Sequence, residues 1–311
     1  MLRAVLLRIL DAIPTLFLVL TLVFVTMRLL PGDPALAVLG EQASAPQLAL
    51  FRAKMGLDQP LWQQYIRFLV DAVTVNFGRS FANNFSVTEL VALNLPFTIE
   101  LTIAATVIGT VLSIPVGVIA AVRRGKAADT ASRILSLLGY AVPDFFLGAV
   151  LLVVFALNLG WFPINGGGDG LPDTLWHLFL PALALGLIKA AFVSRLTRSS
   201  LLDVLGQDYV RTARAKCARE ARVVYRHALR NALLPVVTGL GLSVLSTLSG
   251  SVAIELIFGR PGIGSMLIGA IETRDYPVIQ AGVIVFAIFV VAVNLVMDII
   301  CTLIDPRIEE A

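Results

Sequence analysis

The sequence predicts an all-α, polytopic membrane protein with about six transmembrane helices. Its 311 residues are 58% hydrophobic and only 14% charged, and the mean hydropathy is +0.88. Soluble domains carry roughly 25% charged residues and just under half apolar residues, so this chain would expose large apolar patches in water. The apolar residues also gather into long stretches, and the basic residues concentrate in alternate connections between them.

Six apolar stretches reach the ~20 residues that a helix needs to cross the hydrocarbon core. Their apolar character is continuous and lacks an alternation of period two, which favours helices over barrel strands. The first stretch is too long for the apolar region of a signal peptide, so we expect it to remain as a membrane helix. The stretches cover residues 9–30, 98–122, 134–159, 175–196, 233–257 and 278–304.

Basic residues mark one side of the membrane. The connection between the second and third stretches carries four basic residues and the one between the fourth and fifth carries eight, whereas residues 161–174 have none. The positive-inside rule therefore predicts that both termini are cytoplasmic. We therefore attribute the net charge of +3 and the pI of about 9.1 to the membrane topology and to the attraction of basic residues to membrane lipid. We expect no nucleic-acid partner.

We expect the long segment 31–95 to lie on the outer side and to form small helices on the surface. The alternative interpretation is a loose loop. Residues 44–47 form a capping box with proline in the first turn, and Gly56 would end that helix. Pro60 opens a second helix with one apolar face, consisting of Leu61, Tyr65, Phe68 and Leu69. A capping box at residues 86–89 predicts a short third helix that stops before Pro96.

The cytoplasmic loop over about 197–232 is too long for a hairpin connection and too polar to span. Tyr209, Ala213 and Cys217 recur at intervals of four, and Val223 and Val224 suggest a second amphipathic piece. We expect two short helices at the membrane surface, with the polar section ending at Pro235. A polybasic loop attracted to anionic lipid is the alternative interpretation.

No motif for catalysis is found. A phosphate-binding loop needs G-x-x-x-x-G-K-[ST], and the only Gly-Lys pair, at Gly125 and Lys126, lacks the first glycine and the hydroxyl residue. The two histidines, His177 and His227, are predicted on opposite sides of the bilayer, and Cys217 and Cys301 are expected to be inert. We therefore expect a transport subunit without cofactor or metal, not an enzyme.

Ionisable residues within the apolar stretches are functional candidates by default. We expect Glu100 and Arg195 to reach interfacial water, and Lys189 and Asp298 to make a buried ion pair or hydrogen-bonded contact rather than bind substrate. A proton-coupled carrier would place acids near the midplane, and these acids lie mostly off it. A secondary transporter is therefore a less favoured alternative.

Two strings in the cytoplasmic loop, DYVRTARAK at 208–216 and RHALRNALLP at 226–235, resemble the EAA loop of ABC importer permeases, specifically the dipeptide/oligopeptide/nickel branch. Further stretches resemble the same branch and follow in order along nearly the whole chain. They are residues 30–34 (LPGDP), 57–61 (LDQPL), 261–264 (PGIG), 274–277 (RDYP) and 305–308 (DPRI).

The resemblance implies a type I ABC importer permease fold in a bacterial-type cytoplasmic (inner) membrane. Residues 1–95 would form the first transmembrane helix and an external helical segment, and residues 96–311 a five-helix core with the EAA coupling loop. The implied partners are a second homologous permease subunit, two ATP-binding subunits that hydrolyse ATP, and an external solute-binding protein. The implied cargo is di- or oligopeptide, with nickel or another small solute as the alternative.

The resemblance also implies the residues that contact the ATPase, which are Ala213, Arg214, Ala215, Cys217, His227, Leu233 and Pro235. Cys217 stands where the family has glycine. Glycine there would permit a left-handed turn, a conformation that is sterically unfavourable for any residue with a Cβ. We therefore expect either that the turn moves by one residue or that the helix continues.

Overall fold

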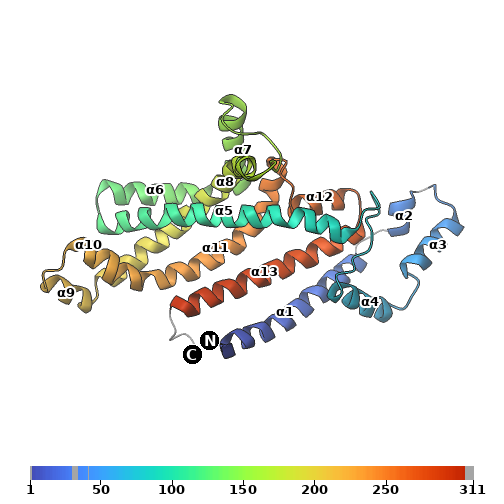
Figure 1. The fold of residues 1–311 in the computed structure, drawn as a ribbon, viewed down its shortest axis with the longest axis horizontal. Helices are drawn as coiled ribbons and strands as arrows, with labels where there is room; N and C mark the ends of the chain where they lie inside the picture. The colour runs from blue at the N-terminus through green and yellow to red at the C-terminus, as the bar shows by residue number, and fades with distance from the viewer. Residues whose placement is uncertain (1, 30–33, 41, 305–311) are drawn as a thin grey trace. The chain divides into compact units, whose positions relative to one another are not determined.

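The computed structural model describes residues 2–29, 34–40 and 42–304, and within these every regular element is helical apart from one isolated bridge between Arg79 and Ser86. Five helices are long and apolar enough to span a membrane, or six if one sharply bent pair is a single span, which confirms the predicted fold class (Figure 1). The elements are α1 (Leu2–Leu29), α2 (Pro34–Leu39), α3 (Ala45–Met55), α4 (Leu61–Val73), α5 (Val87–Val122), α6 (Ala127–Ala141), α7 (Asp144–Leu151), η1 (Leu152–Asn158), α8 (Leu171–Leu205), α9 (Asp208–Ala215), α10 (Glu220–Arg222), η2 (Val223–Ala228), α11 (Leu229–Ile257), α12 (Ile263–Glu272) and α13 (Tyr276–Ile304).

The described chain divides into two compact units. The core unit comprises residues 2–5, 98–260 and 293–304, and the N-terminal unit comprises residues 6–97 and 261–292. Two of the stretches that carry the family resemblance, 30–34 and 305–308, lie almost wholly outside the described residues, as do the side chains of Asp298 and Cys301.

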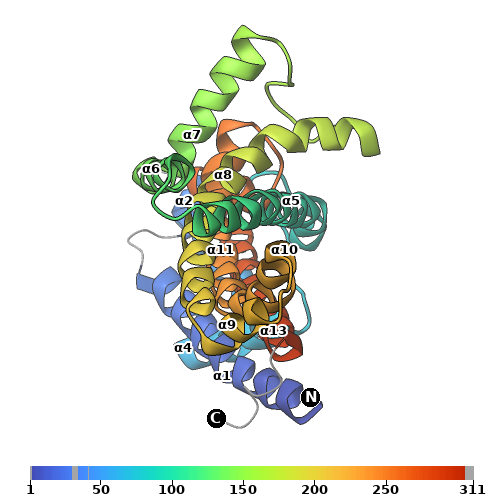
Figure 2. The same cartoon turned by 90° about the vertical axis from the view of Figure 1, so that its left-hand side faces the viewer.

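Small residues let the helices of the core unit approach closely. A Cβ on Gly117 of α5 would lie 2.5 Å from the Cβ of Thr197 and 2.7 Å from the carbonyl oxygen of Ser194, both on α8. A Cβ on Gly239 of α11 would likewise overlap the side chain of Leu196 on α8. Helix α8 also packs along α6, and Figure 2 shows this group of helices from one end. Close backbone approach of this kind is typical of helices packed in membranes.

The third predicted span, 134–159, is not continuous. Helices α6 and α7 meet at an angle of 102°, and Figure 2 shows α7 turning away from α6. Val142 between them is extended, with φ −94° and ψ 123°. The following Pro143 explains this, because a proline ring clashes with a preceding residue in the helical conformation.

The first two predicted helices of the N-terminal unit are confirmed. The backbone N–H of Ser44 donates to Oε1 of Gln47 at 2.9 Å, and Gly56 ends α3 with a left-handed φ of 67°. Helix α4 starts after Pro60. Its Phe68 packs on Phe24 with ring centroids 5.7 Å apart, in a cluster that includes Tyr65 and Leu69, whereas Leu61 of the predicted face is 63% exposed.

The third predicted helix of this segment does not stop before Pro96. Helix α5 begins at Val87 as expected and continues through Pro96 for 36 residues. Proline removes one backbone hydrogen bond, and in a long apolar helix the surrounding groups compensate for this local loss.

Candidate functional site

Helix α9, which carries the first half of the predicted coupling motif, is anchored to the core unit along one side. Val210 is fully buried, and the hydroxyl of Tyr209 accepts a hydrogen bond from Nδ2 of Asn231 at 2.7 Å. Asp208 lies in the first turn and Arg214 in the last, so both charges interact favourably with the helix dipole. The opposite side of α9 is left in solvent.

Cys217 itself makes the turn after α9. Its φ is +56°, and it is exposed. The N–H of Cys217 donates to the carbonyl of Arg214 at 2.9 Å and that of Ala218 to the carbonyl of Ala213 at 3.4 Å, which together form a Schellman motif. The expectation that the turn moves or the helix continues is therefore wrong. The two backbone hydrogen bonds compensate for the steric cost of a left-handed cysteine.

An ion pair closes the loop across this turn. The guanidinium of Arg214 donates from Nε to Oε2 of Glu220 at 3.2 Å and from its terminal nitrogen to Oε1 at 2.7 Å. These hydrogen bonds raise the pKa of Arg214 above its ordinary value. Because both side chains are solvent-exposed, the pair fixes the shape of the loop more than it stabilises the fold.

The second short helix expected in this loop is the start of a long one. Residues Glu220–Ile257 run on as α10, η2 and α11 without a break, through Pro235. Val224 and Ala228 of η2 are buried against Val118 of α5 and Leu201 of α8. The predicted amphipathic face is thus present, and it packs on the core unit.

The structure brings part of the predicted site together. Ala213 and the exposed Arg214, Ala215 and Cys217 share the end of α9 and its turn. His227 is half-buried in η2. Leu233 and Pro235 lie further along α11, about 9 and 12 Å beyond His227 at the rise of a regular helix. Leu233 is half-buried and Pro235 is exposed, and both belong to the long helix α11 rather than to the turn after α9.

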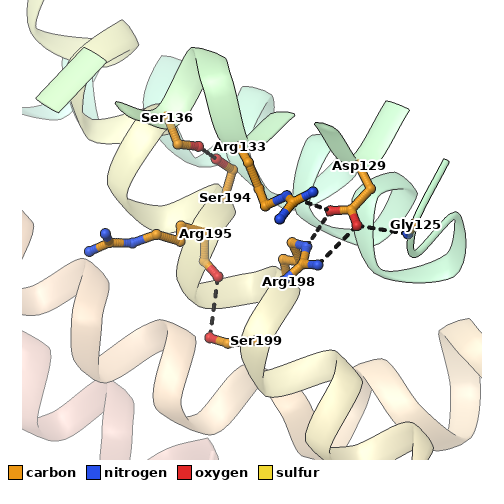
Figure 3. A network of polar contacts seen from close by, with 8 residues as sticks. All are labelled: Gly125, Asp129, Arg133, Ser136, Ser194, Arg195, Arg198 and Ser199. Atoms are coloured by element: carbon orange, nitrogen blue, oxygen red, sulfur yellow. Dashed lines mark hydrogen bonds and ion pairs between the residues drawn. The ribbon is translucent and has the colours of Figure 1, made fainter. Parts of the chain in front are cut away.

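A buried carboxylate that the sequence did not single out joins α6 to α8 close to this loop (Figure 3). Asp129 is 2% exposed and accepts hydrogen bonds from Nε of Arg198 at 2.6 Å and from the terminal nitrogen of the same guanidinium at 3.0 Å. The N–H of Gly125 donates to it at 2.9 Å, and Nε of Arg133 lies 3.7 Å away. Arg198 is one of the eight basic residues of the loop that begins at about residue 197, and no spacing in the sequence links it to Asp129.

Lys189 makes the hydrogen-bonded contact that was expected of it. Its side chain is 3% exposed, and Nζ donates to Oγ1 of Thr106 at 2.6 Å. Thr106 and Thr102 each donate to the carbonyl one turn earlier on α5, and Oγ1 of Thr98 donates to the fully buried Glu255 at 2.7 Å. This polar stripe is satisfied within the core unit.

Glu100 lies near this stripe but reaches the surface. Its side chain is 42% exposed, and it accepts a hydrogen bond from Arg260 at 2.8 Å. Arg195, also expected near water, is exposed, and its guanidinium lies 5.4 Å from the ring centroid of Tyr140. Both side chains are thus accessible at the surface of the core unit, and their position at the membrane interface stays a prediction.

Comparison with known families matches almost the whole chain. The family described as binding-protein-dependent transport system inner membrane component matches residues 113–310. The family of the N-terminal part of such membrane components matches residues 1–102. The two matches together leave only residues 103–112 and the last residue uncovered.

Comparison with individual proteins also finds membrane subunits of transport systems. The chain is 42% identical over 309 residues to the glutathione transport system permease protein GsiC of Escherichia coli K12, covering 99% of both chains. It has the same identity and coverage with GsiC of Shigella dysenteriae. Among solved structures, inward-facing forms of the MetNI methionine ABC transporter align with TM-scores of 0.56 and 0.57 at 19% identity, covering 69% of this chain and 96% of theirs. At that identity the likeness supports the fold alone.

Proposed function

Since the chain belongs to the family of binding-protein-dependent transport system inner membrane components, and is thus an ABC importer permease of the cytoplasmic membrane, we propose that its cargo is di- or oligopeptide. The observation that carries this proposal is the 42% identity to GsiC over 99% of both chains. The name of that relative assigns it glutathione, which is a tripeptide. A peptide cargo for this chain is therefore the simplest extrapolation.

The proposal includes the partners. A second homologous permease subunit would complete the pathway, two ATP-binding subunits would hydrolyse ATP, and an external solute-binding protein would deliver the peptide. The proposal also includes the division of the chain into a first helix with an outer segment, residues 1–95, and a five-helix core, residues 96–311.

We assign the ATPase contact to the end of α9. Three features support the assignment: Arg214, Ala215 and Cys217 are exposed, the Schellman turn fixes their backbone, and Val210 ties the helix to the core. An exposed but rigid helix end is suited to transmit movement, because it can be displaced only together with the helices that carry it. His227, Leu233 and Pro235, on the long helix that follows the turn, remain part of the proposed contact.

The test is reconstitution of the importer from the genes that encode its subunits. Purification in mild detergent should yield this chain in stoichiometric complex with a second permease and ATP-binding subunits. In proteoliposomes, the complex should accumulate a radiolabelled di- or tripeptide only when ATP and the solute-binding protein are both present. A chain that purifies alone and moves solute on an ion gradient would refute the proposal.

The same proteoliposomes separate the possible cargoes. Uptake of glutathione, a neutral tripeptide and Ni²⁺ is measured in parallel, each with the cognate binding protein. Peptide uptake without Ni²⁺ uptake is expected. Ni²⁺ uptake alone would overturn the peptide cargo and leave the importer class intact.

A further inference from the structure

We propose that a cavity in the N-terminal unit binds the carboxylate end of a short peptide, an inference that rests on the proposed peptide cargo. The cavity has a volume of about 620 Å³ and is lined by residues of α1, α3, α4, the segment 76–84 and the start of α13. This volume lies within the ~300–1,000 Å³ that is typical of sites for small molecules. All of its lining belongs to one compact unit.

The charge of the lining favours an anion. Arg28, Arg67 and Arg79 face the cavity, and in the described part of the chain Asp71 is the only acidic residue that lines it. Asp71 lies 3.8 Å from Nε of Arg67, with side-chain exposures of 38% and 60%, so it compensates that charge weakly. Guanidinium groups match a carboxylate well because they can donate two parallel hydrogen bonds to it.

Two of the three arginines are held by neutral groups. Arg28 donates to Oε1 of Gln64 at 2.5 Å, and the amide nitrogen of Gln64 donates in turn to the carbonyl of Gln59 at 2.7 Å. Arg79 donates to the carbonyl of Asn84 at 3.0 Å. Neutral partners orient a guanidinium without cancelling its charge. Such preorganisation lowers the ordering cost when an anion binds.

The remaining lining is largely apolar. Phe51, Phe68, Phe77 and Phe81 all contribute to it, and the rings of Phe51 and Phe81 meet edge to face with centroids 5.6 Å apart. A bare inorganic anion would leave these rings uncovered. An oxyanion that carries an apolar group would cover them, as the last residues of a peptide do. A lipid phosphate shares this chemistry, and the test separates the two sources.

The nearby carboxylate of Asp275 is already used by the wall of the cavity. Ser80 donates to it at 2.5 Å, and the backbone N–H groups of Phe81 and Ala82 donate at 3.0 and 3.3 Å. Asp275 thereby fixes the segment that presents Ser80 and Phe81 to the cavity. These neutral donors leave the negative charge of Asp275 in place, but Asp275 binds the segment 80–82 and does not itself line the cavity.

The experiment measures binding to the assembled transporter in phosphatidylcholine nanodiscs without the solute-binding protein. The probes are radiolabelled trileucine with a free carboxylate and its C-terminal amide. We expect the free acid to bind about tenfold more tightly than the amide, since charge-assisted hydrogen bonds are lost with the amide. The triple variant Arg28→Gln, Arg67→Gln, Arg79→Gln should abolish this preference. The corresponding triple Lys variant should keep part of it.

Arg274→Gln serves as the control, because Arg274 is an exposed arginine of the same unit that does not line the cavity. It should leave the preference for the free acid unchanged. Equal binding of acid and amide, or a preference that survives the triple Gln variant, would overturn the site. Retention of phosphatidylglycerol that depends on the three arginines, with no binding of trileucine, would assign the cavity to lipid and overturn the peptide inference.

Uptake of trileucine by the same preparation, with ATP and the binding protein, keeps the two proposals apart. Uptake without the acid preference would overturn the site alone. Binding with the acid preference but without uptake would overturn the peptide cargo.

Discussion

The carboxylate of Asp129 on α6 and the guanidinium of Arg198 on α8 form a two-point hydrogen-bonded pair, with donor–acceptor distances of 2.6 and 3.0 Å (Figure 3). Arg198 lies two turns before the end of α8, and α9 begins three residues after that end. The pair therefore fixes α6 to α8, the helix that leads into α9 and its candidate coupling surface.

Replacing Arg198 with Gln should lower the thermal midpoint of the complex in detergent, because Asp129 would remain buried with only part of its hydrogen bonds. Arg133→Gln is the matched control, since Arg133 lies 3.7 Å from the same carboxylate but is 55% exposed. It should change the midpoint little. Equal effects of the two substitutions would show that the Arg198 contact is not the anchor.

Ala215→Glu should abolish co-purification of the ATP-binding subunits. Ala215 is exposed at the end of α9, and a charged group there would be forced into the packed contact we assign to this surface. Ala127→Glu places the same charge at the exposed start of α6 and should leave the complex intact. Normal subunit stoichiometry and normal peptide-dependent uptake in the Ala215 variant would refute the coupling assignment.

Cys217→Gly should be tolerated in transport and should stabilise the turn by about 1 kcal/mol, because glycine adopts a φ of +56° without the Cβ penalty. Cys217→Val should do the opposite, since a β-branched residue is poorly accommodated there. Hydrogen exchange at the amides of residues 217 and 218 reports the turn directly. Loss of transport in the Gly variant would reveal a role for the thiol itself.

Gly117→Ala should destabilise the core unit by about 1–3 kcal/mol, because the added Cβ would overlap Thr197 and the backbone oxygen of Ser194. Gly269→Ala in α12 is the control, since nothing lies within 4 Å of the added atom. That substitution should be neutral or stabilising by about 0.5–1 kcal/mol. The comparison is made by denaturant or thermal unfolding in the same detergent, and a reversed order would contradict the packing of α5 on α8.

Thr106→Val should be more harmful than Lys189→Met. The first leaves the buried ammonium of Lys189 without its hydroxyl acceptor, which costs about 1–3 kcal/mol. The second replaces the ammonium by an apolar chain of similar length beside Gly109. The double variant should regain most of the loss caused by Thr106→Val. Additive effects in this double-mutant cycle would exclude the contact as an energetic unit.

Several predictions from the sequence were confirmed because the physics behind them is local. The capping box at Ser44 and the left-handed conformation of Gly56 depend only on neighbouring residues. The long apolar helices depend only on the length and composition of their own segments. The helix over 208–215 likewise follows from its own spacing. By contrast, α5 passes through Pro96, because helical context outweighed a local breaker.

By itself, then, the sequence determined that this protein is a multi-helix membrane permease, that its apolar stretches form helices, and which exposed loop carries the motif of its family. The tertiary structure alone decided that Arg198 meets Asp129, that Lys189 meets Thr106, and that Cys217 rather than a neighbour takes the left-handed turn. The reason is physical. Composition and spacing report free energies of single segments in lipid or water, whereas these contacts depend on which helix faces meet and how closely the small residues let them approach.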